Sequence, residues 1–268
     1  MIRDMTIGQY YPADSILHRL DPRVKLVGTL LYIISLFVVK HYISYIIVTL
    51  FICTIIYLSK VPVKFILKGL KPILILLIFT VGFNLFLTRG TPVLQWGIIT
   101  ITKEGIRTAL LMGFRLIFLI IGSSIMTYTT TPNQLTDGLE NLLWPLSKIK
   151  VPVHEIAMMM SIALRFIPIL VEETDKIMKA QMARGADFES GNIIQKAKSL
   201  IPLLVPLFVS AFRRANDLAM AMEARCYRGG KGRTKMKPLK YTKKDAAGYL
   251  ILAVYFLAMM VPGTVNIL

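Results

Sequence analysis

Two tripeptides contain the side chains of this 268-residue chain that are best suited to specific binding chemistry. They are Ala183-Arg184-Gly185 and Ala224-Arg225-Cys226, and each follows a long, mostly apolar helical pattern. A guanidinium group presents a rigid fork of donors that can bind a carboxylate bidentately, and small neighbouring residues let a partner surface approach closely. The pattern therefore favours docking chemistry, with one arginine at the tip of each of two helices.

An ordinary helix ending would explain either tripeptide alone. The helix macrodipole favours a cation in the last turn, and glycine readily adopts the left-handed conformation that ends many helices. The two arginines, however, recur forty-one positions apart in similar segments, which favours a shared function. Cys226 departs from the glycine of the first tripeptide, so a role that needs a glycine backbone conformation there is in question.

Catalytic, metal and nucleotide sites are not indicated. His154-Glu155 begins a metalloprotease-like pattern, but residue 158 is methionine where that pattern needs a second histidine. The only other histidines are His18 and His41, so a histidine metal site is not expected. Residues 229–232 lack the spacing of a phosphate-binding loop. We expect no cofactor and no catalytic residue, so any ATP must be bound by another chain.

The composition predicts a membrane protein. Hydrophobic residues make up 55% of the chain, and several apolar runs approach the length of a bilayer crossing. The net charge of +17 could suggest nucleic-acid binding in a soluble domain. Most lysines and arginines lie between the apolar runs, however, as expected for cytoplasmic loops, so nucleic acid is not an expected partner. The fold class predicted is an all-α polytopic membrane protein.

About five transmembrane helices are expected, at 24–39, 42–58, 72–87, 108–128 and 245–261. Asp21 and Pro22 form an N-cap and first-turn pair before the first of them. The basic linker 60–71 has the spacing of an amphipathic helix at the inner surface. Nineteen lysines or arginines fall within 129–244, against four in the segments assigned outside. The positive-inside rule then places the N-terminus in the cytoplasm.

The chain changes character at Thr131. Thr131 to Gln134 has the pattern of a capping box, which predicts the start of an amphipathic helix. Two long helical units are predicted after it, at 151–184 and 193–225. Charges within 151–171, and a helical pattern that continues past Pro168, argue against a simple span there. The basic stretch 227–244 marks the cytoplasm and suits contact with anionic lipid. The predicted parts are a membrane domain of four helices (1–128), a cytoplasmic domain with both arginine tripeptides (129–244) and a C-terminal transmembrane helix (245–268).

The sequence resembles the transmembrane T component of energy-coupling factor (ECF) transporters, the prokaryotic ABC-type importers of vitamins and transition-metal ions. The resemblance covers nearly the whole chain, and the paired arginine tripeptides are its most specific part. The stretches that carry it are His18–Lys25, Thr130–Pro132, Gln181–Ala186 and Ala221–Gly230.

The resemblance implies a non-catalytic subunit of the prokaryotic cell membrane whose two long coupling helices cross on the cytoplasmic side. Their tips would dock into grooves of two ABC ATPase subunits. The docking residues would be Ala183, Arg184, Gly185, Ala224, Arg225 and Cys226. A membrane-embedded, substrate-binding S component would pack on the apolar faces of the same helices, through Met158, Met159, Leu164, Pro168 and Pro206. The resemblance does not select among vitamins, nickel and cobalt as substrate, nor between a dedicated and a shared S component.

The same residues argue against two other functions. A self-contained permease should show polar residues along several spans or inverted repeats, and neither is visible. A membrane-embedded enzyme needs convergent acidic or histidine side chains at membrane depth, where the predicted spans offer little beyond Arg115. We interpret Arg115 first as a structural charge that lies at the membrane interface or faces the helix bundle, and second as a substrate contact.

Overall fold

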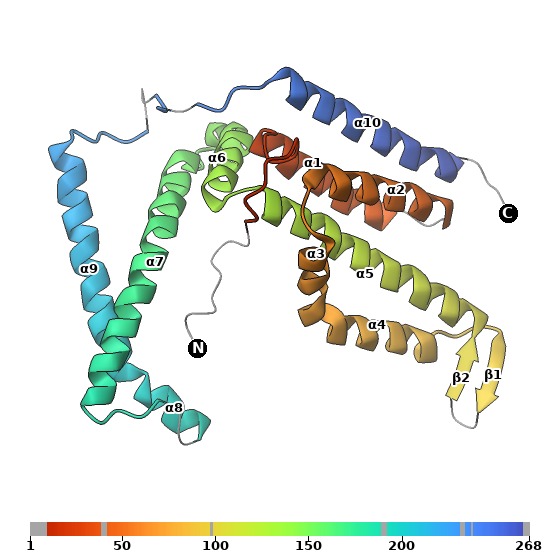
Figure 1. The fold of residues 1–268 in the computed structure, drawn as a ribbon, viewed down its shortest axis with the longest axis horizontal. Helices are drawn as coiled ribbons and strands as arrows, with labels where there is room; N and C mark the ends of the chain where they lie inside the picture. Colours follow the sequence, from red (N-terminus) through yellow and green to blue (C-terminus); the bar gives the residue numbers. More distant parts are fainter. Residues whose placement is uncertain are drawn as a thin grey trace. The chain divides into compact units, whose positions relative to one another are not determined.

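The computed structural model describes residues 10–38, 42–96, 99–188, 192–230, 234–236 and 238–264, and these are predominantly helical (Figure 1). The chain divides into two compact units. The membrane unit comprises Gly8–Leu139 and Leu239–Leu268, and the motif unit is built mainly from Glu140–Pro238. The last helix thus belongs to the same unit as the first ones. The functional division at 128 and 244 stays a prediction.

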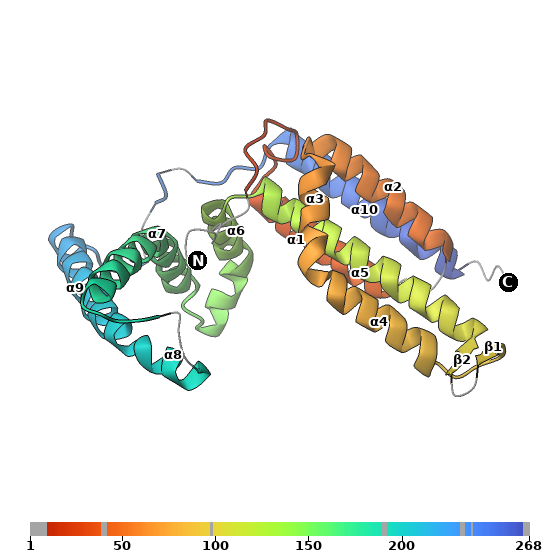
Figure 2. The ribbon, with the colours of Figure 1, turned by 60° about the horizontal axis from the view of Figure 1, so that its bottom comes forward.

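Four helices lie side by side in the membrane unit (Figure 2). They are α1 (Pro22–Val38), α2 (Tyr42–Ser59), α5 (Lys103–Thr129) and α10 (Lys243–Thr264). Polar side chains inside the bundle bond to neighbouring helices: the Tyr32 hydroxyl donates to the Phe118 carbonyl at 2.8 Å, and the Ser35 and Tyr255 hydroxyls lie 2.9 Å apart. The buried core consists of Tyr32, Leu36, Val48, Ile52 and Tyr255.

The linker predicted as an amphipathic helix is α3 (Val63–Leu70), in which Ile66 is buried while Lys64 and Lys68 are exposed. It continues through a short 3-10 turn (Lys71–Ile73) into α4 (Leu74–Leu87), which packs along α5. A two-stranded hairpin follows, β1 (Pro92–Trp96) and β2 (Ile99–Thr102). The next helix starts at residue 103, five positions before the span expected from the sequence, because the Thr102 hydroxyl caps it by accepting from the Gly105 amide.

Length and composition mark three helical segments of the described chain as able to cross a membrane, 63–87, 103–129 and 153–183, and a shorter apolar helix spans 43–59. The first two and the shorter helix correspond to the expected spans 72–87, 108–128 and 42–58. The expected spans 24–39 and 245–261 correspond to α1 and α10, although residue 39 lies outside the described residues. The segment 153–183 is also long and apolar enough to cross a membrane, although the charges within it favour a helix that is not simply transmembrane.

The motif unit contains the end of α6 (Pro132–Leu143), a 3-10 segment (Trp144–Ile149), α7 (Val153–Ala183), α8 (Ile193–Ser199) and α9 (Ile201–Ala224). The predicted capping box is confirmed: the Gln134 amide donates to the Thr131 hydroxyl at 3.3 Å, and the Gln134 side chain accepts from the Thr131 amide at 3.2 Å. Helix α7 runs through Pro168 without a break. The second predicted unit is split at Leu200 into α8 and α9, since Pro202 disfavours a helix that continues through the residues before it.

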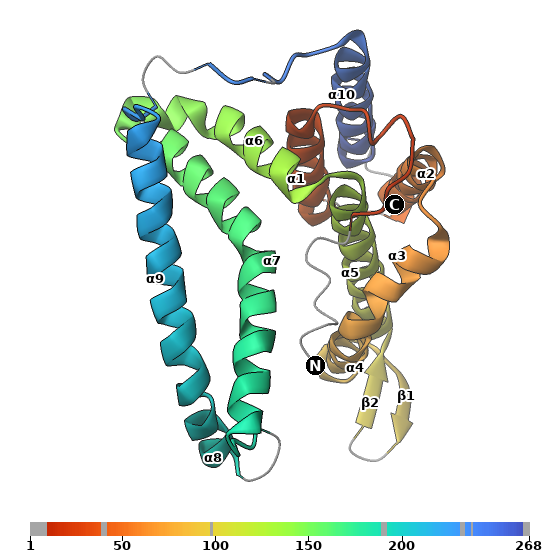
Figure 3. The same ribbon diagram turned by 60° about the vertical axis from the view of Figure 1, so that its left-hand side comes forward.

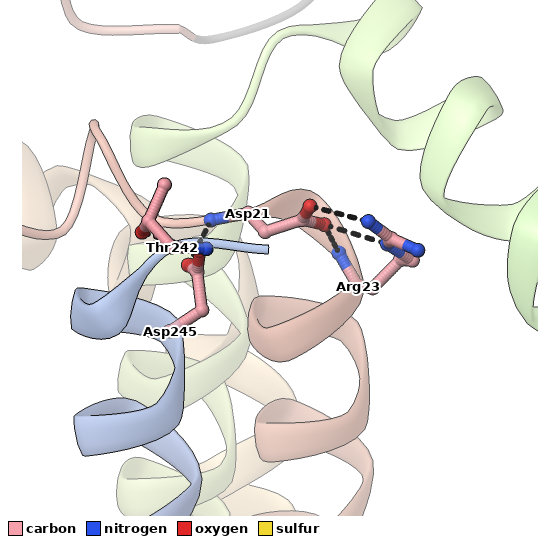
Figure 4. Close-up of polar contacts among 4 residues, drawn as sticks. All are labelled: Asp21, Arg23, Thr242 and Asp245. Carbon is pink, nitrogen blue, oxygen red and sulfur yellow. Dashed lines mark hydrogen bonds and ion pairs between the residues drawn. The ribbon is translucent and has the colours of Figure 1, made fainter. Parts of the chain in front are cut away.

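Two helix N-caps interlock at one end of the membrane unit (Figure 4). Asp21 caps α1, as predicted, by accepting from the Arg23 amide at 2.9 Å, and it also pairs with the Arg23 guanidinium at 2.8 Å. The Asp21 amide donates to Asp245 at 2.8 Å. Asp245 in turn accepts from the amide and hydroxyl of Thr242, which precedes α10. Both carboxylates are buried, so the start of α10 is fixed against the start of α1.

We expect Asp245→Ala to lower the thermal stability of the purified chain. The change removes the α10 cap and leaves the buried Asp21 amide without its acceptor, at a cost of about 1 to 3 kcal/mol. The measurement is the thermal unfolding midpoint in detergent. Asp217→Ala, which alters an exposed carboxylate in α9, is the matched control and should leave the midpoint unchanged. An equal midpoint for both variants would show that the interlocked caps contribute nothing measurable.

Candidate functional site

Helices α7 and α9 form an antiparallel pair (Figures 1 and 3). Near the end of α7, the Gln181 side chain donates to the Pro202 carbonyl at the start of α9, at 3.2 Å. Farther along, the Arg214 guanidinium on α9 donates to Glu173 on α7 at 2.9 Å. The C-termini of the two helices therefore lie at opposite ends of the pair. Helix α9 has 24 residues, which corresponds to about 36 Å of helix.

The first arginine tripeptide ends α7 in a Schellman motif. Gly185 has φ +90°, and its amide donates to the Met182 carbonyl at 3.0 Å. The Ala186 amide donates back to the Gln181 carbonyl, also at 3.0 Å. These two bonds are the pair that defines the motif, in which a left-handed residue reverses the chain and satisfies the last carbonyl groups. Arg184 is the last residue before the reversal.

The second tripeptide ends α9 in the same way. The Cys226 amide donates to the Glu223 carbonyl at 2.8 Å, and the Tyr227 amide donates to the Met222 carbonyl at 3.0 Å. Cys226 adopts φ +55°, the left-handed conformation that glycine adopts at the first site. The question raised by cysteine at this position is thereby answered for the backbone: the turn is kept. A side chain with a Cβ atom carries a strain cost of about 1 to 2 kcal/mol there.

Both arginine side chains point away from the unit's packed interior. Arg184 and Arg225 are exposed, as are the alanines that precede them and the residues that follow them. Within the described residues, no hydrogen bond or ion pair joins either guanidinium to the protein. The structure thus does not bring the predicted docking residues together at one place. It presents them as two separate tips of the same construction.

The loop after the second tip is tied back to the start of α7. Glu140 accepts from Lys235 at 2.6 Å and from the His154 ring at 2.9 Å. Burial raises the pKa of the Glu140 carboxyl, but these two hydrogen bonds outweigh burial and hold the pKa below its usual value. Gly230 passes so close that a Cβ there would lie 2.4 Å from the His154 ring. No sequence pattern predicts this cluster, because its members are distant in the chain.

Comparison with known proteins gives consistent matches along the chain. The family described as "Cobalt transport protein" (CbiQ) matches residues 13–236. "Energy-coupling factor transporter transmembrane protein EcfT" of Ruminiclostridium cellulolyticum is 59% identical over 91% of this chain and 92% of its own length. The EcfT of Clostridium kluyveri is also 59% identical, with the same coverage, and that of Bacillus subtilis is 48% identical over 95% of this chain and 96% of its own. The chain belongs to the EcfT family, the transmembrane T components of energy-coupling factor transporters.

Membership in the EcfT family confirms the resemblance read from the sequence. The chain is a multi-pass membrane protein and a non-catalytic subunit of an ECF transporter. Within the described residues, no group of three or more histidine, cysteine, aspartate or glutamate side chains could hold a metal ion.

Helices α7 and α9 each carry apolar side chains that are exposed. Of the residues predicted to contact an S component, Met159 and Pro168 are exposed, and the other three are half-buried: Met158, Leu164 and Pro206. The sequence reasoning missed a continuous apolar stripe on α9. Its members recur at helical spacing, a signal that could have been found: Ile201, Leu204, Val205, Phe208 and Phe212, all of them exposed. The Phe208 and Phe212 rings pack 4.9 Å apart.

We expect Cys226→Gly to stabilise the end of α9. Glycine removes the strain of a left-handed side chain, and part of that gain is offset by the greater freedom of glycine in the unfolded chain. A net gain of about 0.5 to 1 kcal/mol should slow amide hydrogen exchange at 224–228 by roughly two- to fivefold. Cys226→Ala is the control, because it removes the thiol and keeps the strain. Slower exchange in the alanine variant would assign the effect to the thiol instead.

Proposed function

We propose that this T component transmits the ATP-driven motion of two ABC ATPase subunits to a membrane-embedded S component, for uptake of a vitamin or a transition-metal ion. The observation that carries the proposal is the pair of identical helix ends. Each presents an exposed arginine at a Schellman turn, and the two lie at opposite ends of one antiparallel helix pair. Two equivalent helix tips about 36 Å apart suit two equivalent binding grooves, one on each ATPase subunit, better than a single groove.

The docking chemistry follows from the form of each tip. An exposed guanidinium beside small residues can enter a groove on an ATPase and bind a carboxylate there bidentately. We assign Ala183, Arg184 and Gly185 to one ATPase and Ala224, Arg225 and Cys226 to the other. The Schellman turns fix the direction in which each arginine leaves its helix. The Glu140, His154 and Lys235 cluster fixes the loop behind the second tip.

The coupling step rests on the stiffness of the helix pair. Helix α7 is continuous over 31 residues, and the Glu173 to Arg214 ion pair and the Gln181 to Pro202 hydrogen bond tie it to α9. A displacement imposed at one tip is therefore carried along a helix rather than absorbed by a loop. The exposed stripe on α9, with Met158, Met159, Leu164, Pro168 and Pro206, is the surface we assign to the S component.

The same proposal sets the topology. The basic stretches place the N-terminus and both tips on the cytoplasmic side, where ATP is available to the ATPase subunits. We assign five crossings to α1, α2, α4, α5 and α10, with 129–244 as the coupling domain. Helix α7, although apolar enough to cross by composition, then lies against the membrane with its apolar half and continues into the aqueous phase with its charged half.

We expect Arg184→Glu and Arg225→Glu each to weaken ATPase association and to abolish ATP-driven uptake in the reconstituted complex. Reversing one charge of a desolvated interfacial pair costs on the order of 2 to 5 kcal/mol. Arg213→Glu, an exposed arginine within α9, is the control and should retain both properties. Measurements are co-purification of the ATPase subunits and uptake by proteoliposomes. Normal association and transport in both tip variants would refute the docking role.

A second change addresses the S component separately. Phe208→Asp places a charge in the apolar stripe, where the side chain is 66% exposed. We expect loss of the S component in pull-down with retention of both ATPases, because a buried unpaired carboxylate is costly at an apolar interface. The control is Ile149→Asp, at another exposed apolar position of the motif unit. If both variants hold the S component equally, the stripe is not its binding surface.

A further inference from the structure

An apolar pocket of about 280 Å³ lies inside the membrane unit. It is bounded by the first half of α1, the second half of α2, the end of α5 and the start of α10. Three of its lining residues are glycines, Gly28, Gly122 and Gly248, which add no side-chain volume. The docking surfaces described above belong to the motif unit, so the pocket has no part in them.

The pocket opens beside the exposed face of α10. Most of its lining is buried or half-buried, and we define the mouth by the exposed members of the lining: Ile16, Lys244, Ala247 and Ile251. Two of these exposed residues, Lys244 and Ala247, flank Asp245 of the interlocked caps that begin α1 and α10, which Figure 4 shows. Polar backbone ends and charged side chains at this end of the bundle indicate the level of the lipid headgroups, with the apolar part of the pocket below it.

Two lysines stand at the polar end of the pocket. Lys25 donates to the Thr129 carbonyl at 2.8 Å and to the His18 carbonyl at 3.4 Å, and both acceptors are uncharged. Lys244 is exposed on α10. Asp21 pairs with Arg23, and Asp245 accepts from backbone and hydroxyl groups, but the charges of both carboxylates also act on Lys25. Because Arg23, Lys25 and Lys244 outnumber these two carboxylates, this end of the pocket keeps a net positive charge that suits an anionic group.

The physical setting restricts the occupant. The unit is surrounded by hydrocarbon, an empty apolar cavity loses dispersion contacts, and water needs polar partners that the apolar part of this lining does not supply. The volume is just below the range of about 300 to 1,000 Å³ that holds whole small ligands, so it suits part of one chain. Lipid tails are as apolar as the pocket itself, so burial alone gives no preference among lipids. Selectivity has to come from the headgroup.

We propose that this pocket holds part of one acyl chain of an anionic phospholipid, with its phosphate group bound by Lys244 and Lys25. The acyl chain fills the space between α1, α2, α5 and α10, and the headgroup lies at the mouth beside α10. The bound lipid then forms part of the packing that holds α10 in the membrane unit.

The headgroup is tested with the full chain in detergent. Phosphatidylglycerol or phosphatidylcholine with identical acyl chains is added, and retained lipid is counted by native mass spectrometry. The protein should retain a single phosphatidylglycerol in preference to phosphatidylcholine. Lys244→Gln should weaken that binding about fivefold, as expected for one basic residue at an anionic headgroup. Lys243→Gln, the neighbouring exposed lysine that does not line the pocket, should bind as the unaltered chain does.

The acyl chain is tested by filling the pocket. Ala247→Phe at the mouth should remove retention of the lipid, whereas Ala246→Phe, on an exposed neighbour outside the lining, should preserve it. Equal binding of the two lipids, an equal effect of the two lysine changes, or displacement of the lipid by inorganic phosphate would each overturn the proposal. If Ala247→Phe does not fold, the comparison of Lys244→Gln with Lys243→Gln tests the proposal by itself.

Discussion

The membrane unit depends on the interlock between two helix caps, because the chain leaves this unit for about a hundred residues before α10 returns to it. Asp21 caps α1 and is itself held through its amide by Asp245, whose other oxygen caps α10. One buried carboxylate thus fixes two helix starts that are 224 positions apart. Buried carboxylates and amides are costly when unpaired, so this arrangement strongly favours a single position of α10. The apolar pocket between α10 and α2 exists only because α10 is held there.

The motif unit relies on a different constraint, the left-handed residue that ends each long helix. A helix that frayed would let its last arginine sample many directions, whereas a Schellman turn fixes the last carbonyl groups and the chain reversal together. The two ends use the same hydrogen bonds although one has glycine and the other cysteine. That identity despite a change of residue type is a stronger indication of a shared role than the tripeptides themselves. The antiparallel pairing of α7 and α9 then sets the two tips apart.

Much of this arrangement could be predicted from the sequence, because it depends on interactions between residues that are close in the chain. The caps at Asp21 and Thr131, the amphipathic linker around Ile66, and the apolar helices all follow from short patterns of side-chain type, and the structure confirms them. The early start of α5 was missed because Thr102 caps the helix within what looked like a loop. The break at Leu200 was missed because an apolar run with prolines reads equally well as one kinked helix or two.

The sequence by itself determined the class of protein, the existence of the two arginine tips and the family to which the chain belongs, since these rest on composition, periodicity and motifs. Only the tertiary structure decided that the tips lie at opposite ends of one helix pair, through contacts such as Glu173 with Arg214. It also decided that Glu140 joins His154 to Lys235. The physical reason is the same in each case. These features depend on which distant residues meet, and the spacing of residues along a chain does not specify that.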